Sequence, residues 1–376
     1  MQKTSIIFFL FLFLITGCSQ NGKNELAKEK EPMRVGWISD LSGSVSKWGA
    51  DKAVQIAVDE INEAGGINGR KFELIMEDGK CRSKDAVNAM NKLIHVDGVH
   101  FVLGGHCSPE SLAIAPIAQE NKVLMFAQMT TSPDLSDAGD YVFRTSQVNT
   151  EQSKLIADLM LQKLGIKSLG IIYEETGYAE PIARVLKEQF EQNGGSVLLY
   201  EGYSQGEKDF RSSLTKVLAK KPDALFFSPQ DNENAGLLLQ QIHELGGKEH
   251  IFGNEIFGSE DLVKNMGVYM DGIIYSTPDY NPLGEKEKTF IEKYKQKYNV
   301  EGLPFGLYTA EVYDATNILA QAISKYGDNV DKVKDALYKV QDYYGASGKF
   351  SINEKGDGVR NYVLKRVQNG KVLNLE

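Results

Sequence analysis

The stretch RVGWI (34–38), followed by AVQIAVDEINEAGG (53–66) and FELIM (72–76), decides the fold of this chain. Its first and last segments are short and apolar, as in buried strands. The middle segment carries Ala53, Ile56, Ala57, Ile61 and Ala64 at helical spacing, and a glycine pair ends it. A strand, a helix and a second strand in this order predict two parallel strands with a crossover helix.

The same alternation runs through the chain twice, before and after about residue 148. The first run predicts helices over 86–94 and from 109, with strands at 101–103 and 123–127. The second run predicts strands at 168–173, 196–200 and 224–227, with helices over 180–192, 209–219 and 233–245. We therefore expect an α/β protein with two Rossmann-like lobes built on parallel sheets.

Further elements follow the second run. A strand is expected near 272–276, helices over 285–298 and 304–325, and strands at 348–352 and 362–368. Asn369-Gly370 is typical of a tight hairpin turn. These late elements need not all lie in the second lobe.

Length and charge narrow the classes of function. With 376 residues, the chain is too long for one compact core, which favours two domains. Its net charge is −9, from 42 Lys and Arg against 51 Asp and Glu. An acidic surface argues against a nucleic-acid partner, since the phosphate backbone selects basic patches.

The N-terminus indicates export. Lys3 precedes an apolar run, 6–15, and the sequence then reads Leu-Ile-Thr-Gly-Cys (14–18). This run is too short to span a bilayer and is typical of a signal peptide, and the small residue before Cys18 resembles a bacterial lipobox. We expect residues 1–17 to be a lipoprotein signal peptide, Cys18 to be lipidated and 18–32 to be a flexible spacer. The protein would then be lipid-anchored on the outer face of the cell membrane; an ordinary secretion signal is the alternative.

Two cysteines remain if Cys18 carries lipid. In an oxidising compartment, Cys81 and Cys107 are expected to pair. A metal site that uses both cysteines with His106 is the competing interpretation. No fourth ligand at a typical zinc spacing is evident, so we expect no metal.

Polar clusters follow several predicted strands, where parallel sheets bind ligands. Ser108 is expected to be the N-cap of a helix with Pro109 at its first position, and a helix N-terminus attracts carboxylates. Thr130 and Thr131 occupy the equivalent place after the next strand, and simple capping is the alternative role for these hydroxyls. Glu255 follows another apolar strand and could take up an ammonium group, or be a solvated loop acid.

Six segments together resemble a known family. They are WISDLSGSVSKWG (37–49), NEAGGING (62–69), Glu77-Asp78 before Cys81, 104–108, GEKDF (206–210) and Tyr313-Asp314-Ala315. In this order they resemble the branched-chain amino acid binding proteins of ABC transporters, which have a type I periplasmic-binding fold with a three-strand hinge. The resemblance covers the whole chain after the spacer.

The resemblance implies roles for particular residues. It implies a disulfide between Cys81 and Cys107, a carboxylate site at Ser108, Thr130 and Thr131, and an ammonium site at Glu255. Aromatic lining falls on Trp48, Tyr178 and Tyr308, for which packing is the alternative at Trp48 and Tyr308. The binding residues expected from the sequence are thus Ser108, Thr130, Thr131, Tyr178, Asp231, Glu255, Trp48 and Tyr308.

The sequence also departs from the family. Ala127-Gln128-Met129 is bulkier than the family's approach to the threonine. Gln230-Asp231 stands where relatives that bind aliphatic amino acids have an aromatic residue, so Asp231 would suit a polar ligand or a second contact to the ammonium. The family pattern implies an N-terminal lobe of 33–148 plus 278–345 and a C-terminal lobe of 149–277 plus 346–376.

Three functions are open. The first is a monomeric solute-binding lipoprotein that captures an amino acid or a related amide or carboxylate and delivers it to an ABC permease, with no cofactor and no catalysis. The second is a ligand-sensing receptor subunit that acts with a signalling partner. The third is a serine esterase, because GYSQG (202–206) matches a nucleophile elbow around Ser204. Only His243 and His250 follow that serine, and His243 lies within a helical pattern.

Overall fold

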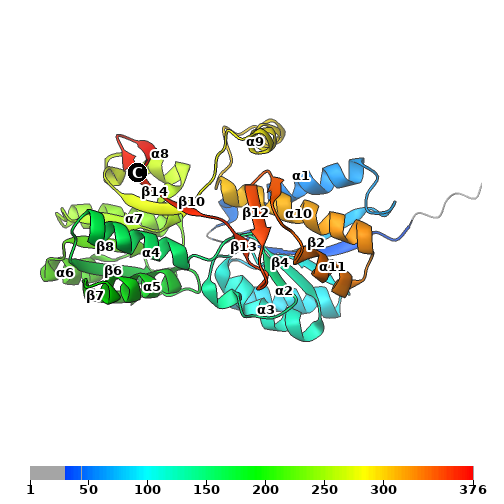
Figure 1. Cartoon of the computed structure of the whole chain (residues 1–376), viewed down its shortest axis with the longest axis horizontal. Helices are drawn as coiled ribbons and strands as arrows, with labels where there is room; N and C mark the ends of the chain where they lie inside the picture. The colour runs from blue at the N-terminus through cyan, green and yellow to red at the C-terminus, as the bar shows by residue number, and fades with distance from the viewer. Residues whose placement is uncertain (1–29, 44, 376) are drawn as a thin grey trace, which may run out of the picture.

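The computed structural model describes residues 30–43 and 45–375. The signal peptide, Cys18 and most of the spacer predicted from the sequence lie outside these residues. Two α/β lobes lie side by side, and chain segments run between them (Figure 1). Within the described part of the chain, no helix is long and apolar enough to cross a membrane.

The first lobe has a parallel five-stranded sheet in the order β2-β1-β3-β4-β5. The β4 residues Leu124–Ala127 are all buried, as expected for a strand covered on both faces. The strands are β1 (Met33–Ser39), β2 (Phe72–Asp78), β3 (Phe101–Leu103), β4 (Leu124–Ala127) and β5 (Val142–Arg144). The helices of this run are α1 (Ala50–Glu63), α2 (Ser83–His95) and α3 (Ser108–Asn121).

The second lobe has a seven-stranded sheet in the order β15-β14-β10-β9-β8-β6-β7. Its strands are β6 (Ser168–Glu174), β7 (Ser196–Tyr203), β8 (Ala224–Ser228), β9 (His250–Gly253), β10 (Ile274–Pro278), β14 (Tyr362–Gln368) and β15 (Lys371–Asn374). Strands β6 to β10 are parallel, whereas β14 and β15 are antiparallel and joined at Asn369-Gly370. Both turn residues have positive φ, so the predicted hairpin is confirmed.

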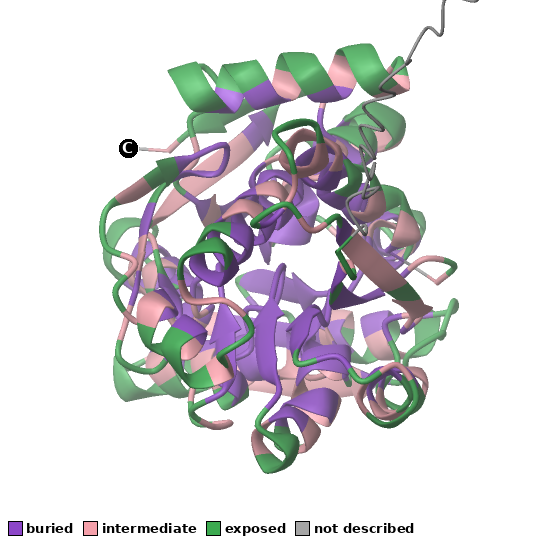
Figure 2. Cartoon of the chain, turned by 90° about the vertical axis from the view of Figure 1, so that its right-hand side faces the viewer, coloured by how far each residue is buried: buried purple, intermediate pink, exposed green. Residues whose placement is uncertain are grey.

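The helices of the second lobe interleave with these strands. They are α4 (Thr150–Asp158), which continues as a π-helical turn (Leu159–Lys163), α5 (Ala179–Gln192), α6 (Arg211–Lys220), α7 (Asn232–Glu244) and α8 (Glu260–Met266). Short 3₁₀ turns occur at Ser46–Trp48, Pro133–Leu135, Glu255–Gly258 and Gly267–Met270. Purple, buried ribbon fills the interior, and green, exposed ribbon covers the outside (Figure 2).

The chain returns to the first lobe after β10. Helix α10 (Leu307–Tyr326) packs against α1, and α9 (Glu285–Tyr298) and α11 (Val330–Leu337) flank it. A small sheet of β11 (Tyr343–Gly345), β12 (Gly348–Ile352) and β13 (Gly358–Val359) follows.

The expected lobe boundary at residue 346 is too early. The Ile352 N–H donates to Val340 O at 2.8 Å, and the Arg144 N–H donates to Gly356 O at 2.9 Å, so this small sheet is held to the first lobe. The chain joins the second sheet only at Tyr362. The segments that run between the lobes are therefore 145–149, 279–284 and 360–361.

Candidate ligand-binding site

A disulfide fixes the start of α3 at the carboxyl end of the first sheet. Cys81 and Cys107 are bonded, with their Cα atoms 5.8 Å apart, so the predicted pairing is confirmed and the metal site is wrong. Glu110 braces the same corner, accepting from the N–H of Cys81 at 2.9 Å and of His106 at 2.8 Å. Burial raises the pKa of Glu110 to about 7.

Helix α3 begins one residue earlier than expected, so Ser108 is not its N-cap. Cys107, with extended φ and ψ, is the N-cap, and Ser108 is the first residue of α3. Its hydroxyl is therefore not a cap; Ser108 Oγ accepts from the N–H of Ser132 at 3.4 Å. Ser108 thereby joins the loops that follow β3 and β4.

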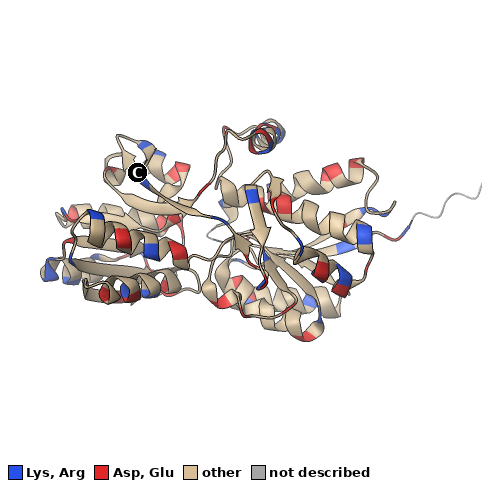
Figure 3. Cartoon of the chain, viewed as in Figure 1, with Lys and Arg blue, Asp and Glu red and all other residues tan. Residues whose placement is uncertain are grey.

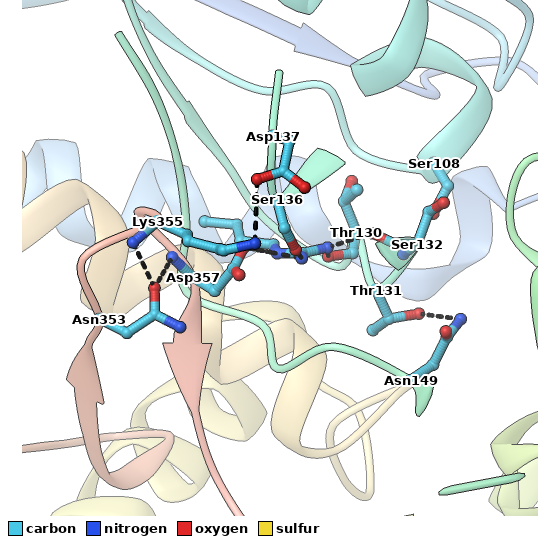
Figure 4. Close-up of polar contacts among 11 residues, drawn as sticks. Ser108, Thr130, Thr131, Ser132, Ser136, Asp137, Asn149, Asn353, Lys355 and Asp357 are labelled. Carbon is cyan, nitrogen blue, oxygen red and sulfur yellow. Dashed lines mark hydrogen bonds and ion pairs between the residues drawn. The ribbon is translucent and has the colours of Figure 1, made fainter. Parts of the chain in front are cut away.

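The two threonines have different surroundings. The Thr130 hydroxyl lies 2.7 Å from Ser111 Oγ, within the first lobe. Thr131 Oγ1 instead accepts from Asn149 Nδ2 at 3.3 Å, and the Asn149 N–H donates to Thr131 O at 3.0 Å. Figure 4 shows Thr131 directed toward Asn149, which lies in the first crossing between the lobes.

Glu255 is buried, with 4% of its surface exposed, so the solvated loop acid is wrong. Its Oε2 accepts from Gln152 Nε2 on α4, and its Oε1 accepts from the Tyr308 hydroxyl on α10 at 3.2 Å. Burial raises the pKa of Glu255, and these hydrogen bonds oppose the rise. A buried carboxylate of this kind favours a cationic or N–H-rich partner.

Aromatic rings lie beside this carboxylate. Trp48 stacks on Phe305 with ring centroids 4.1 Å apart, and Phe305 stacks on Tyr308 at 5.2 Å. Tyr178, at the start of α5, is buried; burial raises its pKa, and the charge of Glu255 adds to the rise. The structure thus brings Trp48, Tyr308, Tyr178 and Glu255 together.

The lobes are in contact beside Ser108. A Cβ placed on Gly177 would lie 2.6 Å from Leu112 Cδ1 of α3, so the loop before Tyr178 packs closely against the first lobe. A larger residue at this position would require the Leu112 side chain to move.

Asp231 is not brought to this cluster by any contact of the described residues. Its carboxylate caps α7, with Oδ1 accepting from the N–H of Asn234 at 2.9 Å. Gln230 Oε1 accepts from Thr176 Oγ1 at 2.9 Å. Capping explains Asp231 without a ligand, and its binding role stays a prediction.

Sequence reasoning missed several residues of the site. Gln147 Nε2 donates to the hydroxyls of Tyr308 at 3.2 Å and of Tyr362 at 3.1 Å, and Gln152 holds Glu255. These glutamines lie in the first crossing and the helix after it, a stretch for which no motif was recognised. A cavity of about 560 Å³, lined in part by Glu255, Tyr308, Phe305, Tyr275 and Leu303, adjoins the cluster from the side of α9.

The surroundings of Ser204 do not support the esterase interpretation. It is an exposed loop residue after the edge strand β7, and α6 begins only at Arg211. The ring of His243 packs edge-on against that of Tyr269, with the ring centroids 5.0 Å apart. No hydrogen bond among the described residues links His243 to Ser204.

Two lobes in contact over buried hydroxyl, carboxylate and aromatic groups define a two-lobed ligand-binding protein. Comparison with known families matches residues 32–371 to the periplasmic binding proteins, and the chain belongs to this family. Its fold is therefore the type I periplasmic-binding fold expected from the sequence.

Individual relatives agree with this assignment. The leucine-, isoleucine-, valine-, threonine- and alanine-binding protein of Pseudomonas aeruginosa is 28% identical over 87% of both chains. A leucine-binding protein from Thermotoga maritima is 27% identical, with a TM-score of 0.81 over 92% of this chain and 98% of that one. A branched-chain amino acid binding protein of Streptococcus pneumoniae, solved with isoleucine, is 28% identical, with a TM-score of 0.80 over 91% and 98%.

Proposed function

We propose that this protein captures an amino acid, or a closely related small ligand, between its lobes and delivers it to an ABC permease. The observation that carries the proposal is the buried Glu255 carboxylate, which the second lobe presents beside aromatic residues of the first. The names of the relatives, several of which bind aliphatic amino acids, support this substrate class.

Each half of the ligand has a matching group in this proposal. Ser108 and Thr131 donate hydroxyl hydrogen bonds to the ligand carboxylate, and the backbone of Thr130 assists. Glu255 receives the ammonium group, and this charge pair keeps Glu255 ionised despite its burial. Trp48, Tyr178 and Tyr308 enclose the side chain, and Asp231 adds a polar contact when the side chain is polar.

Ligand binding and closure of the two lobes are thermodynamically coupled. The ligand contacts groups of both lobes only when they are closed, so it has a higher affinity for the closed form and shifts the population toward it. The closed form then docks on the permease. No step breaks a covalent bond, so we assign the chain no enzymatic activity and no cofactor.

Anchoring follows from the proposed signal peptide. Lipidation at Cys18 would hold a monomer on the outer face of the cell membrane, with residues 18–32 as the tether. The permease would lie in the same membrane, so the tether keeps the loaded protein close to it.

A thermal-shift screen of amino acids, small amides and carboxylates tests the substrate class. A true ligand at about 100 times its dissociation constant should add ~2.7 kcal/mol to the free energy of unfolding. A shift by α-amino acids supports the proposal. Shifts by amides or aromatic acids alone would contradict the role of Glu255.

Two single-residue variants test the proposed binding roles of Ser108 and Glu255. Ser108→Ala and Glu255→Gln should each weaken binding of the amino acid found in the screen at least tenfold, as loss of a charge-assisted hydrogen bond of ~1.5–3 kcal/mol requires. Glu287→Gln is a matched control, because Glu287 is equally buried and accepts from the Tyr344 hydroxyl at 2.9 Å, away from the site. Full affinity in both site variants would refute the assignment.

A further inference from the structure

Arg144 is a buried cation beside the ligand-facing loop, and the function proposed above gives it no role. It ends β5, at the edge of the first sheet, and its side chain is 1% exposed. Its Nη1 donates to Thr130 O at 3.2 Å and to Ser132 O at 2.6 Å. The guanidinium therefore clamps the carbonyls on either side of Thr131, while Nη2 donates to Ser136 Oγ at 2.8 Å.

Asp357 holds the guanidinium in this position. Its Oδ1 lies 2.7 Å from both Nε and Nη2 of Arg144, and its side chain is 5% exposed. Asn353 orients Asp357, because Asn353 Oδ1 accepts from the Asp357 N–H at 2.9 Å. On the surface above, Lys355 forms an ion pair with Asp137 at 2.9 Å (Figure 4).

Both partners border a crossing between the lobes. Arg144 directly precedes the crossing at 145–149, and Asp357 lies just before the crossing at 360–361. Strand β13, which leads into the crossing at 360–361, also lies against the first crossing, since a Cβ on Gly358 would lie 2.0 Å from Thr145 O. The ion pair thus lies in the first lobe, where the chain enters two of the crossings, and the guanidinium connects these two points to the loop that carries Thr131.

Resting on the function proposed above, we propose that Arg144 and Asp357 are positioning residues that couple the hinge to the 130–132 loop. When the lobes close, the crossing segments and the loop move as one unit, so Thr131 reaches the ligand only in the closed form.

The variants Asp357→Asn and Arg144→Lys test the coupling. Asparagine keeps the shape but removes the charge, and lysine cannot span Asp357 and both carbonyls at once. Asp314→Asn is the matched control: Asp314 is also a buried acid of the first lobe, but it accepts from the N–H groups of Ala346 and Ser347 and does not contact the loop.

Hydrogen exchange of the 128–136 backbone amides is the first measurement, because it needs no ligand. Asp357→Asn and Arg144→Lys should raise exchange of this segment at least tenfold, and Asp314→Asn should leave it within twofold of the wild type. Unchanged exchange in folded Asp357→Asn and Arg144→Lys would overturn the proposal. If either fails to fold, Asn353→Ala loosens Asp357 while keeping its charge, and the same result is required of it.

Ligand affinity is the second measurement. Both variants should weaken binding at least tenfold at a temperature where they are fully folded, and combining them should cost little more than either alone. Tenfold weakening in Asp314→Asn as well would show a general stability effect and overturn the proposal. If the wild type binds no amino acid, the proposed function fails, and the exchange result still decides whether the pair positions the loop.

Discussion

The Tyr308 hydroxyl donates a hydrogen bond to Glu255 Oε1, 3.2 Å away, and this bond runs from one lobe to the other. Tyr308 belongs to α10, which packs against α1 of the first lobe. Glu255 belongs to the second lobe, where it begins the short 3₁₀ turn that follows β9 and Asn254. Charged residues are scattered over the outside of both lobes (Figure 3). Glu255 differs from those surface residues because its side chain is buried. The bond is a direct latch between the lobes.

Replacing Tyr308 with phenylalanine removes that latch and keeps the stacked ring. We expect ligand affinity to fall about tenfold or more, since hydrogen bonds to charged groups contribute ~1.5–3 kcal/mol. Tyr313→Phe is the control on the same helix: its hydroxyl donates to Glu60 Oε2 at 2.6 Å, within the first lobe. Calorimetric titration should show weaker binding for Tyr308→Phe alone; equal effects in both variants would count against a latch.

The raised pKa of Glu255 predicts how binding depends on pH. Burial raises the pKa of Glu255 above its usual 4.5. As the pH falls through this raised pKa, Glu255 takes up a proton in the free protein. The protonated acid cannot pair with an ammonium group, so binding must release the proton. We expect affinity to decrease on acidification, by up to about tenfold per pH unit below the pKa.

Titration calorimetry in buffers of different ionisation enthalpy measures the proton released. The wild type should release protons below the pKa of Glu255 and release none well above it. Glu255→Gln, which has no proton to release, should bind weakly with no such dependence. Identical proton release in both proteins would exclude Glu255 as the ammonium site.

Local sequence patterns predicted most elements but not the contacts that complete the site. The helix over Glu285–Tyr298 and the strand over Tyr362–Gln368 have the predicted bounds, because apolar periodicity and turn residues are local signals. The short strand β5 was missed, since three buried residues have no measurable period. Arg144, at its end, was therefore missed as well.

Apart from the Cys81–Cys107 disulfide, the non-local side-chain pairs named above could not be predicted. Asp357 lies 213 positions from Arg144, and Gln152 lies 103 positions from Glu255. Only the folded topology brings these pairs together. The same reason explains the misplaced boundary at 346, because the hydrogen bonds that hold residues 352 and 356 to the first lobe involve backbone atoms, which no side-chain pattern reveals.

Two buried groups at the start of α3 should give opposing effects of pH on stability. The raised pKa of Glu110, about 7 against 4.5, favours the folded state at low pH, and this stability is lost as the pH rises through that window. Burial lowers the pKa of His106 from 6.5 to about 3, so its contribution is present above 6.5 and is lost as the pH falls. Between 4.5 and 6.5 the two effects nearly cancel.

Glu110→Gln should expose the effect of His106. Relative to the wild type, its free energy of unfolding should fall by ~1.4 kcal/mol per pH unit from pH 6.5 to 4.5. Urea unfolding at three pH values measures this slope. Glu120→Gln, at an exposed position of the same helix, should follow the wild type; parallel profiles for all three proteins would contradict the assignment.

Tryptophan fluorescence should report ligand binding through one of the two tryptophans. Trp48 lies in the aromatic stack, 4.1 Å from Phe305 and 6.3 Å from His106, whereas Trp37 is fully buried in β1. A ligand seated against the stack changes the polarity and quenching around Trp48 but leaves the surroundings of Trp37 unchanged. Trp37→Phe should therefore keep the ligand-induced change in emission, and Trp48→Phe should lose it. A signal that survives in Trp48→Phe and disappears in Trp37→Phe would place the ligand, or the structural change it causes, in the sheet of the first lobe, because only Trp37 would then sense it.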